Sequence, residues 1–189
     1  LELKLLADAG VVGLPNAGKS SLVSRISAAR PKIASYPFTT LTPQLGMVRT
    51  DVDRSFVIAD LPGLVSGASG GKGLGVRFLR HIERTKVLVH VMDMASPFEG
   101  SPFDDYNCIT KELGCYRPDL TTRPRIIAAN KMDVPEAERN LASCRDWIES
   151  QGHAVYPISA LTGAGLVALV EAIDEALQTI RAGEDASSE

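Results

Sequence analysis

Short apolar runs rich in β-branched residues alternate with amphipathic helical patterns along most of the chain. This alternation is typical of a parallel sheet that is covered by helices on both faces. The runs at residues 87–93 and 125–130 are apolar almost throughout, as expected for strands at the centre of such a sheet. The pattern predicts six strands, near residues 8–13, 44–49, 55–60, 87–93, 125–130 and 154–159.

Two apolar stripes at helical spacing predict helices that pack on the sheet. The first stripe consists of Ala137, Leu141, Cys144 and Ile148, which makes Cys144 a core residue rather than a reactive thiol. The second stripe belongs to the final helix and consists of Leu166, Leu169, Val170, Ile173, Leu177 and Ile180. Beyond it, the polar and acidic residues 183–189 are expected to form a disordered tail or linker.

Composition narrows the class of protein. The chain has 189 residues, which fits one domain, and its 44% of hydrophobic residues suffice for a buried core. A formal net charge of −3 argues against the uniformly basic surface of a dedicated nucleic-acid binder. The three cysteines form no C-x-x-C pair, and no apolar run approaches the roughly 20 residues of a membrane span, so a reducing, cytoplasmic location is expected. Because the chain lacks an initiating methionine, we expect it to be a segment of a longer protein.

Residues 13–20 read G-L-P-N-A-G-K-S and match the pattern G-x-x-x-x-G-K-S of a phosphate-binding loop. The segment follows an apolar strand and opens a helix, which is the context that this motif requires. Backbone N–H groups would surround the phosphates, Lys19 would neutralise the β and γ phosphates, and the Ser20 hydroxyl would coordinate Mg²⁺. The predicted binding residues here are Gly13, Leu14, Pro15, Asn16, Ala17, Gly18, Lys19, Ser20 and Ser21.

A second motif on the phosphate side follows the strand expected at residues 55–60, where the sequence continues Asp60, Leu61, Pro62, Gly63. The Asp60 carboxylate would reach Mg²⁺ through water, and the Gly63 backbone N–H would face the γ-phosphate. This D-x-P-G pattern is a common turn on its own, but it gains weight downstream of a phosphate loop. The glycine-rich stretch 61–75 and the proline-rich stretch 30–43 are expected to be mobile loops.

The base that is bound is predicted by Asn130, Lys131, Met132 and Asp133. The Asp133 carboxylate can accept two parallel hydrogen bonds from the N1–H and the exocyclic amine of guanine, whereas adenine has no such donor pair. The Lys131 stem can lie along the purine face, and Asn130 can tie this loop to the base and to the phosphate loop. Further along the chain, Ser159, Ala160 and Leu161 complete the predicted site, with the Ala160 backbone N–H directed at guanine O6.

Together with these motifs, four segments resemble the GTPase domain of the Obg (CgtA) family of TRAFAC GTPases. They are residues 3–8, the loop that contains Pro15 and Asn16, residues 32–41 and residues 71–84. The resemblance covers about residues 1–181, and the GTPase domain is assigned to residues 1–182. It implies a three-layer α/β P-loop NTPase (Ras-like) fold, with about five helices and a six-stranded, mostly parallel sheet that has one antiparallel strand. The glycine-rich amino-terminal domain of the family is missing from this chain.

The resemblance also assigns residues in the loops. Thr40 would be the switch threonine that joins Mg²⁺ in the GTP state, with Thr39 as the competing assignment, and Phe38, Thr39, Thr40 and Leu41 would close over the nucleotide. Ras-like enzymes have a glutamine directly after D-x-x-G that orients the attacking water, but this sequence has Leu64 there, so hydrolysis is expected to be slow. Asn16 either holds a K⁺ ion that does the work of an arginine finger, as in related GTPases, or only caps the turn. The expected catalytic residues are Lys19, Thr40, Gly63 and Asn16.

The function that the resemblance implies is a guanine-nucleotide switch for GTP and GDP, with ppGpp as a further ligand, that acts in assembly of the large ribosomal subunit and in stress or growth control. The basic residues Arg77, Arg80, His81, Arg84 and Lys86 either contact rRNA phosphates or form a solvated helix face. Two alternatives are a nucleotide-stabilised assembly module with incidental hydrolysis and a YchF-like P-loop NTPase, although YchF proteins lack the full Asn-Lys-x-Asp guanine motif. A P-loop ATPase or kinase is disfavoured by Asp133.

Overall fold

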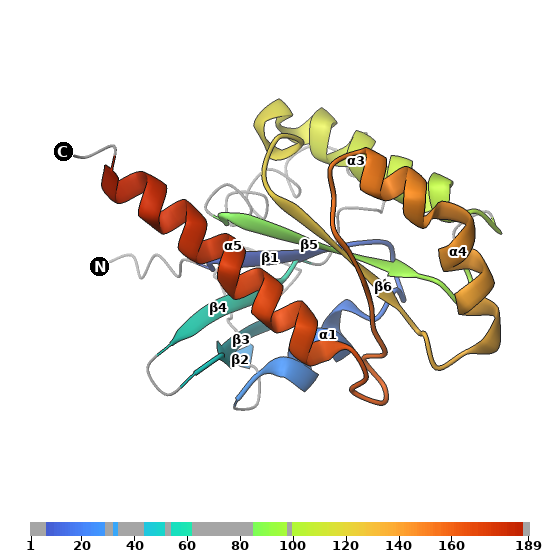
Figure 1. The fold of residues 1–189 in the computed structure, drawn as a ribbon, viewed down its shortest axis with the longest axis horizontal. Coiled ribbons are helices and arrows are strands. Elements are labelled where there is room, and N and C mark those ends of the chain that lie inside the picture. Colours follow the sequence, from blue (N-terminus) through green and yellow to red (C-terminus); the bar gives the residue numbers. More distant parts are fainter. Residues whose placement is uncertain are drawn as a thin grey trace.

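A computed structural model describes residues 7–28, 32–33, 44–51, 54–61, 85–97 and 100–186. Its strands form one sheet in the order β2-β3-β4-β1-β5-β6-β7 (Figure 1). The strands are β1 (Ala9–Val12), β2 (Lys32–Ile33), β3 (Gln44–Arg49), β4 (Ser55–Asp60), β5 (Val87–Asp93), β6 (Arg125–Asn130) and β7 (Val155–Pro157). β3 runs antiparallel to both of its neighbours, and the other described strand pairs are parallel.

The six predicted strands are confirmed, and so is a mostly parallel sheet with one antiparallel strand. The last of them is shorter than predicted, because β7 covers only Val155–Pro157 of the expected 154–159. The sheet also has a two-residue edge strand, β2, which the sequence analysis missed. A strand of two residues is too short to show the alternation on which strand prediction depends.

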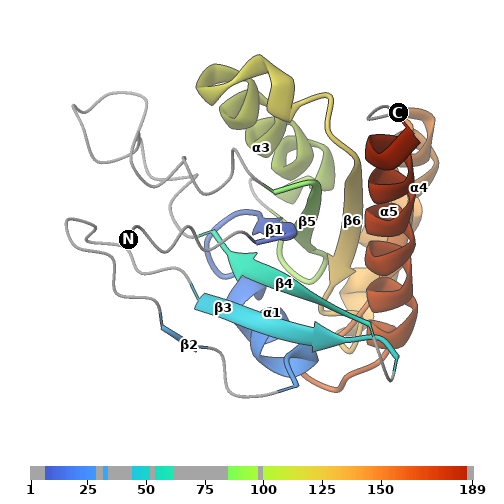
Figure 2. The same ribbon diagram turned by 90° about the vertical axis from the view of Figure 1, so that its left-hand side faces the viewer.

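Four α-helices of the described residues cover both faces of the sheet (Figure 2). They are α1 (Lys19–Ile26), α3 (Pro102–Tyr116), α4 (Pro135–Ser150) and α5 (Leu166–Ala186), and the short 3₁₀ helix η4 (Pro118–Leu120) follows α3. The core residues of α1 and α5 pack against one face of the sheet, and those of α3 and α4 pack against the other. The three-layer fold is therefore confirmed. None of these described helices is long and apolar enough to cross a membrane.

Burial along β5 shows how the sequence produces these layers. All seven residues of β5 are buried. Val87, Val89 and Val91 belong to the core shared with α1 and α5, whereas Leu88 packs with α3 and Met92 with α3 and α4. Because successive side chains of a strand point to opposite faces, a strand that is covered on both faces is mostly apolar on both, and the buried His90 of β5 is paired with Asp105.

The two predicted helical stripes occupy the positions expected of them. All four residues of the α4 stripe are buried, including Cys144, whose thiol has its pKa raised to about 11 by burial. The final helix is longer than predicted, because α5 continues to Ala186 and includes residues 183–186, which the sequence analysis assigned to a disordered tail. That boundary is wrong for these four residues. In the last turn of α5, the Glu184 carboxylate pairs with the Lys86 ammonium group.

Candidate nucleotide-binding site

The carboxyl ends of the parallel strands β1, β4, β5, β6 and β7 meet at one edge of the sheet. The predicted phosphate loop follows β1, Asp60 ends β4, and the guanine motif follows β6. The turn at residues 159–161 follows β7. Motifs that are far apart in the sequence therefore come together at the edge where doubly wound α/β proteins bind ligands.

The phosphate loop connects β1 to α1 by a path that requires glycine at both ends. At Gly13, φ is 149° and a Cβ atom would lie 2.3 Å from the Val91 carbonyl oxygen. At Gly18, φ is 98° and a Cβ atom would lie 2.3 Å from the Asn130 Nδ2. A side chain at either position would push the loop away from β5 or from the guanine motif. The two glycines therefore let the loop lie directly against the neighbouring strands.

Lys19, the first residue of α1, reaches back to this loop. Its Nζ donates hydrogen bonds to the carbonyl oxygens of Gly13 and Leu14, both at 2.8 Å. Burial lowers the pKa of the ammonium group, and the carboxylates of Asp60 and Asp105 oppose that shift. The positive charge thus lies beside the amino end of α1, where backbone N–H groups also attract anions.

Ser20 and Asp60 form a second polar pair next to the loop. The Ser20 hydroxyl donates to Asp60 Oδ2 at 2.5 Å. Asp60 is 3% exposed, and among the described residues its Oδ1 is buried without a hydrogen-bond partner. Burial raises the pKa of this carboxyl group, whereas Ser20 and Lys19 act to lower it. These closely spaced oxygens, one of which lacks a donor, fit Mg²⁺, which prefers oxygen ligands and keeps several waters.

Asn130 links the phosphate loop to the other end of the site. Its Nδ2 donates a hydrogen bond to the Ala17 carbonyl oxygen at 2.7 Å, and its Oδ1 accepts one from the Ala160 backbone N–H at 2.9 Å. The expectation from the sequence is that this N–H faces guanine O6. In the structure it is bonded to Asn130, so a bond to O6 would have to be shared with that amide or replace it.

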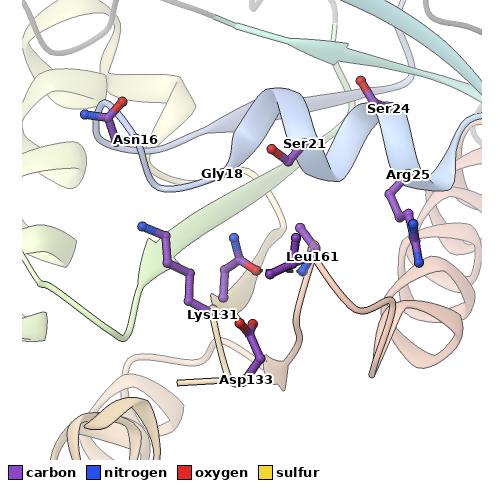
Figure 3. A pocket seen from close by; sticks show the side chains of 10 residues that line it. Asn16, Gly18, Ser21, Ser24, Arg25, Lys131, Asp133 and Leu161 are labelled. Carbon is purple, nitrogen blue, oxygen red and sulfur yellow. Dashed lines mark hydrogen bonds between the residues drawn. The ribbon is translucent and has the colours of Figure 1, made fainter. Parts of the chain in front are cut away.

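The Asp133 carboxylate is held by the turn that follows β7. The buried Ser159 hydroxyl donates to Asp133 Oδ1 at 2.5 Å and accepts a hydrogen bond from the Thr162 backbone N–H at 3.0 Å. Lys131, with a positive φ of 69°, directs its ammonium group to Asp93 at the end of β5. The side chains of Lys131 and Asp133 lie across the pocket from the phosphate loop and α1 (Figure 3).

The pocket has a volume of about 570 Å³. It is lined by Asn16, Gly18, Ser21, Ser24, Arg25, Asn130, Lys131, Asp133, Ala160 and Leu161. Two lining residues, Ser24 and Arg25 in the last turn of α1, were not predicted from the sequence (Figure 3). Arg25 donates a hydrogen bond to the Thr162 carbonyl oxygen at 3.1 Å, so it connects α1 to the turn after β7. No motif spacing could have revealed this contact, since the two residues are 137 positions apart.

The remaining predicted site residues have different placements. Leu61 is buried after β4, and Pro15 and Leu161 are exposed. Several predictions lie outside the described residues: Phe38, Thr39, Thr40, Leu41, Pro62, Gly63, Leu64, residues 3–6, and the basic residues Arg77, Arg80, His81 and Arg84.

The fold and this site define a P-loop nucleotide-binding domain. A family model described as "50S ribosome-binding GTPase" matches residues 8–131. GTPase Obg of Geobacillus thermodenitrificans is 59% identical over 181 residues, which is 95% of this chain and 41% of that protein. GTPase Obg of Myxococcus xanthus is 51% identical over 182 residues, covering 96% of this chain and 38% of the relative. The chain belongs to this GTPase family and resembles its Obg members over nearly its whole length, while it spans about two fifths of the length of those relatives.

Solved structures agree with the fold. The G domain of the Thermotoga maritima FeoB iron transporter superposes with a TM-score of 0.67 at 21% identity, covering 90% of this chain and 98% of that one. An Era variant from Aquifex aeolicus, bound to GDP.AlF4⁻, has a TM-score of 0.66 at 26% identity and covers 89% of this chain and 56% of that one. The Ras-like P-loop architecture expected from the sequence is therefore confirmed.

Proposed function

We propose that this domain is a guanine-nucleotide switch that binds GTP and GDP with Mg²⁺ and hydrolyses GTP slowly. The observation that carries the proposal is the Asn130 amide, which is bonded to Ala17 of the phosphate loop and to Ala160 of the turn after β7. The buried Asn130 side chain thus links the proposed phosphate site to a second site, where the Asp133 carboxylate, held at Oδ1 by Ser159, is an acceptor that suits guanine.

Each residue on the phosphate side has a chemical task in this proposal. Lys19 binds the β and γ phosphates, and Ser20 and Asp60 hold Mg²⁺, with Asp60 acting through water. When bound, Mg²⁺ would neutralise charge on the phosphates. Thr40 as a further Mg²⁺ ligand and Gly63 as a donor to the γ-phosphate are carried by the family resemblance. The Leu64 side chain has no hydrogen-bonding group with which to orient water, so hydrolysis should be slow.

Replacing Asp133 by asparagine tests the guanine assignment. Xanthine carries a carbonyl oxygen where guanine has its exocyclic amine, and the asparagine amide can donate to that oxygen. We therefore expect Asp133→Asn to weaken GDP binding on the order of 100-fold and to strengthen XDP binding. Displacement of a fluorescent GDP or XDP by unlabelled nucleotides measures both constants.

Asp146→Asn is the matched control, because Asp146 is exposed on α4 and does not line the pocket. It should leave both affinities unchanged within about twofold. Unchanged GDP binding in Asp133→Asn, or displacement of GDP by ATP from the parent chain, would contradict the guanine assignment.

The K⁺ proposal rests on Asn16. Its side chain lines the pocket, and its backbone has a positive φ of 63°. We propose that the Asn16 carboxamide oxygen holds K⁺ beside the phosphates, where the ion would do the work of an arginine finger. GTP turnover should be faster in K⁺ than in Na⁺ at equal ionic strength, and Asn16→Asp should alter that preference. Equal turnover in both salts would leave Asn16 as a turn cap.

The proposed partner is the large ribosomal subunit, with assembly of that subunit and growth control as the process and the cytoplasm as the location. Support comes from the description of the matched family and from the Obg relatives. ppGpp is proposed as a further ligand of the guanine site on the same basis. Co-sedimentation with purified large subunits, with GDP or a non-hydrolysable GTP analogue, tests the partner at two salt concentrations. Binding that is equal in both nucleotide states would favour an assembly module with incidental hydrolysis over a switch.

A further inference from the structure

Asp93, the last residue of β5, belongs to none of the nucleotide-binding motifs. Its side chain is 12% exposed, and its Oδ2 lies 2.5 Å from the Lys131 Nζ. Lys131 has the left-handed φ of 69°, which an L-residue rarely adopts without support from its surroundings. The contact therefore involves a lysine that lines the pocket and whose backbone has an unusual conformation.

Asp93 is itself held in place by the turn that it begins. Its Oδ1 accepts hydrogen bonds from the backbone N–H groups of Ala95 and Ser96, both at 3.0 Å. In the same turn, the Met94 N–H donates to the Asn130 carbonyl oxygen at 3.0 Å, and the Met94 carbonyl oxygen accepts a hydrogen bond from Asn140 Nδ2 of α4 at 2.7 Å. The carboxylate is thus a fixed acceptor that joins the end of β5 to the guanine motif.

We propose that Asp93 is a positioning residue of the guanine site. It anchors the Lys131 ammonium group so that the aliphatic stem is ordered along one face of the pocket before the base binds. This proposal deepens the guanine-binding function proposed above and rests on it. Lys131 and Asp133 both lie across the pocket from the phosphate loop, so the ordered stem and the carboxylate bound by the base share one wall (Figure 3).

The physical reason is the conformational freedom of lysine. A free lysine side chain samples many rotamers, and contact with a base would have to order them at the moment of binding. A charge-assisted hydrogen bond to a fixed carboxylate orders the side chain in advance, and such preorganisation increases affinity. A planar base would then pack against the methylene groups of Lys131, since the apolar stem of a lysine can cover an apolar surface while its charged end is held elsewhere.

Asp93→Asn in the 189-residue chain tests the proposal, because asparagine keeps the shape and an acceptor oxygen but removes the charge. We expect the dissociation constant of GDP to rise about tenfold, mainly through faster release. The loss should be equal for GDP and IDP, because the Lys131 stem contacts the ring face and does not read the exocyclic amine that inosine lacks. Fluorescent nucleotide release and competition by GDP and IDP measure these quantities.

Lys131→Met distinguishes positioning from a merely structural role, because methionine keeps an apolar stem and removes the ammonium group. In that background, Asp93→Asn should change GDP affinity by no more than about twofold. Additive losses in the double variant would overturn the proposal, because Asp93 would then act through something other than Lys131.

Asn140→Ala is the matched control. It removes a different hydrogen bond to the same turn and changes neither partner of the Asp93–Lys131 contact. A loss of GDP affinity as large as that of Asp93→Asn would mean that the turn itself is what matters, which would also overturn the proposal. Thermal melting of each variant confirms that it is folded.

The outcomes also separate this inference from the proposed function. If the parent chain binds no guanine nucleotide, both the proposed function and the positioning role of Asp93 fail. If the parent chain binds GDP and Asp93→Asn binds it equally well, only the positioning role of Asp93 fails.

Discussion

The phosphate loop and Lys19 lie in one continuous segment, whereas the guanine motif makes its contacts with separate strand ends. Lys19 bonds to carbonyl oxygens that are five and six residues away in the chain. By contrast, Asn130 bonds to Ala17 across 113 residues, and Ser159 bonds to Asp133 across 26. The difference indicates that a strand, a loop and a helix bring Lys19 to the phosphate loop locally, while the Ser20–Asp60 pair and the contacts of the guanine motif require the completed sheet.

Lys19→Ala breaks the phosphate end alone and should have the largest effect. Losing a charge that binds phosphate in a partly buried site costs about 4 kcal/mol, so GDP affinity should fall roughly 1000-fold. The ratio of GDP to IDP affinity should stay unchanged, because the base contacts are intact. Isothermal titration calorimetry with GDP and with IDP measures the affinity and the ratio. Lys111→Ala, an exposed lysine of α3, is the control and should bind normally. A changed base preference in Lys19→Ala would show that the two ends are not separable.

Asn130→Ala breaks the connection between the two ends and should have the next largest effect. It leaves the Ala17 carbonyl oxygen and the Ala160 N–H without their present partner in a buried region, which costs about 2 kcal/mol of unfolding free energy. GDP affinity should fall about 30-fold. Urea unfolding and nucleotide titration measure the two quantities, with Asn140→Ala as the asparagine control. A loss of affinity without any loss of stability would mean that the amide serves only the ligand.

The pH dependence of Mg²⁺ binding gives a smaller effect that is confined to the phosphate end. Burial raises the pKa of Asp60, and a protonated carboxyl group cannot hold the cation. As pH falls, protons should therefore displace Mg²⁺ at a higher pH than they would for an ordinary aspartate, while GDP over IDP selectivity stays constant. Mg²⁺ titrations of the GDP complex at several pH values measure this. Asp60→Asn should remove the dependence, and its persistence would assign the titration to another group.

The raised pKa of Asp60 also has a consequence for stability. Because the folded state disfavours the charged carboxylate, the folded state binds its proton more tightly than the unfolded chain does. The Asp60 contribution to the unfolding free energy therefore becomes more favourable as pH falls through the raised pKa, and it is unfavourable at neutral pH. Mg²⁺ bound beside the carboxylate would offset that cost, because it stabilises the charged form.

Much of the fold could be predicted from the sequence, because both-face burial leaves a strong signal. The run that became β5 is apolar on both faces except at His90 and Asp93, and the stripe on α4 has helical spacing, so each could be recognised without its neighbours. Two elements, β2 and the last turn of α5, could not be predicted in this way. β2 has two residues and needs β3 beside it, and residues 183–186 are polar and are held by an ion pair to Lys86.

The candidate site divides in the same way. Motif spacing alone singles out Lys19, Ser20, Asp60 and Asp133 as candidate site residues, because short segments carry the chemistry that phosphate and guanine would require. The structure places all four at the same edge of the sheet. Arg25 and Asp93 contact the site through partners 137 and 38 residues away, and no local pattern marks them.

The sequence by itself determined the order of strands and helices and the chemistry of each strand end, because those depend on periodicity and on side-chain type over a few residues. Only the tertiary structure decided that the Asn130 amide joins two loops, that the Ala160 N–H is already bonded, and that Asp93 anchors Lys131. These contacts depend on distances between strands that are neighbours in the sheet but far apart in the chain, and such distances exist only once the sheet has formed.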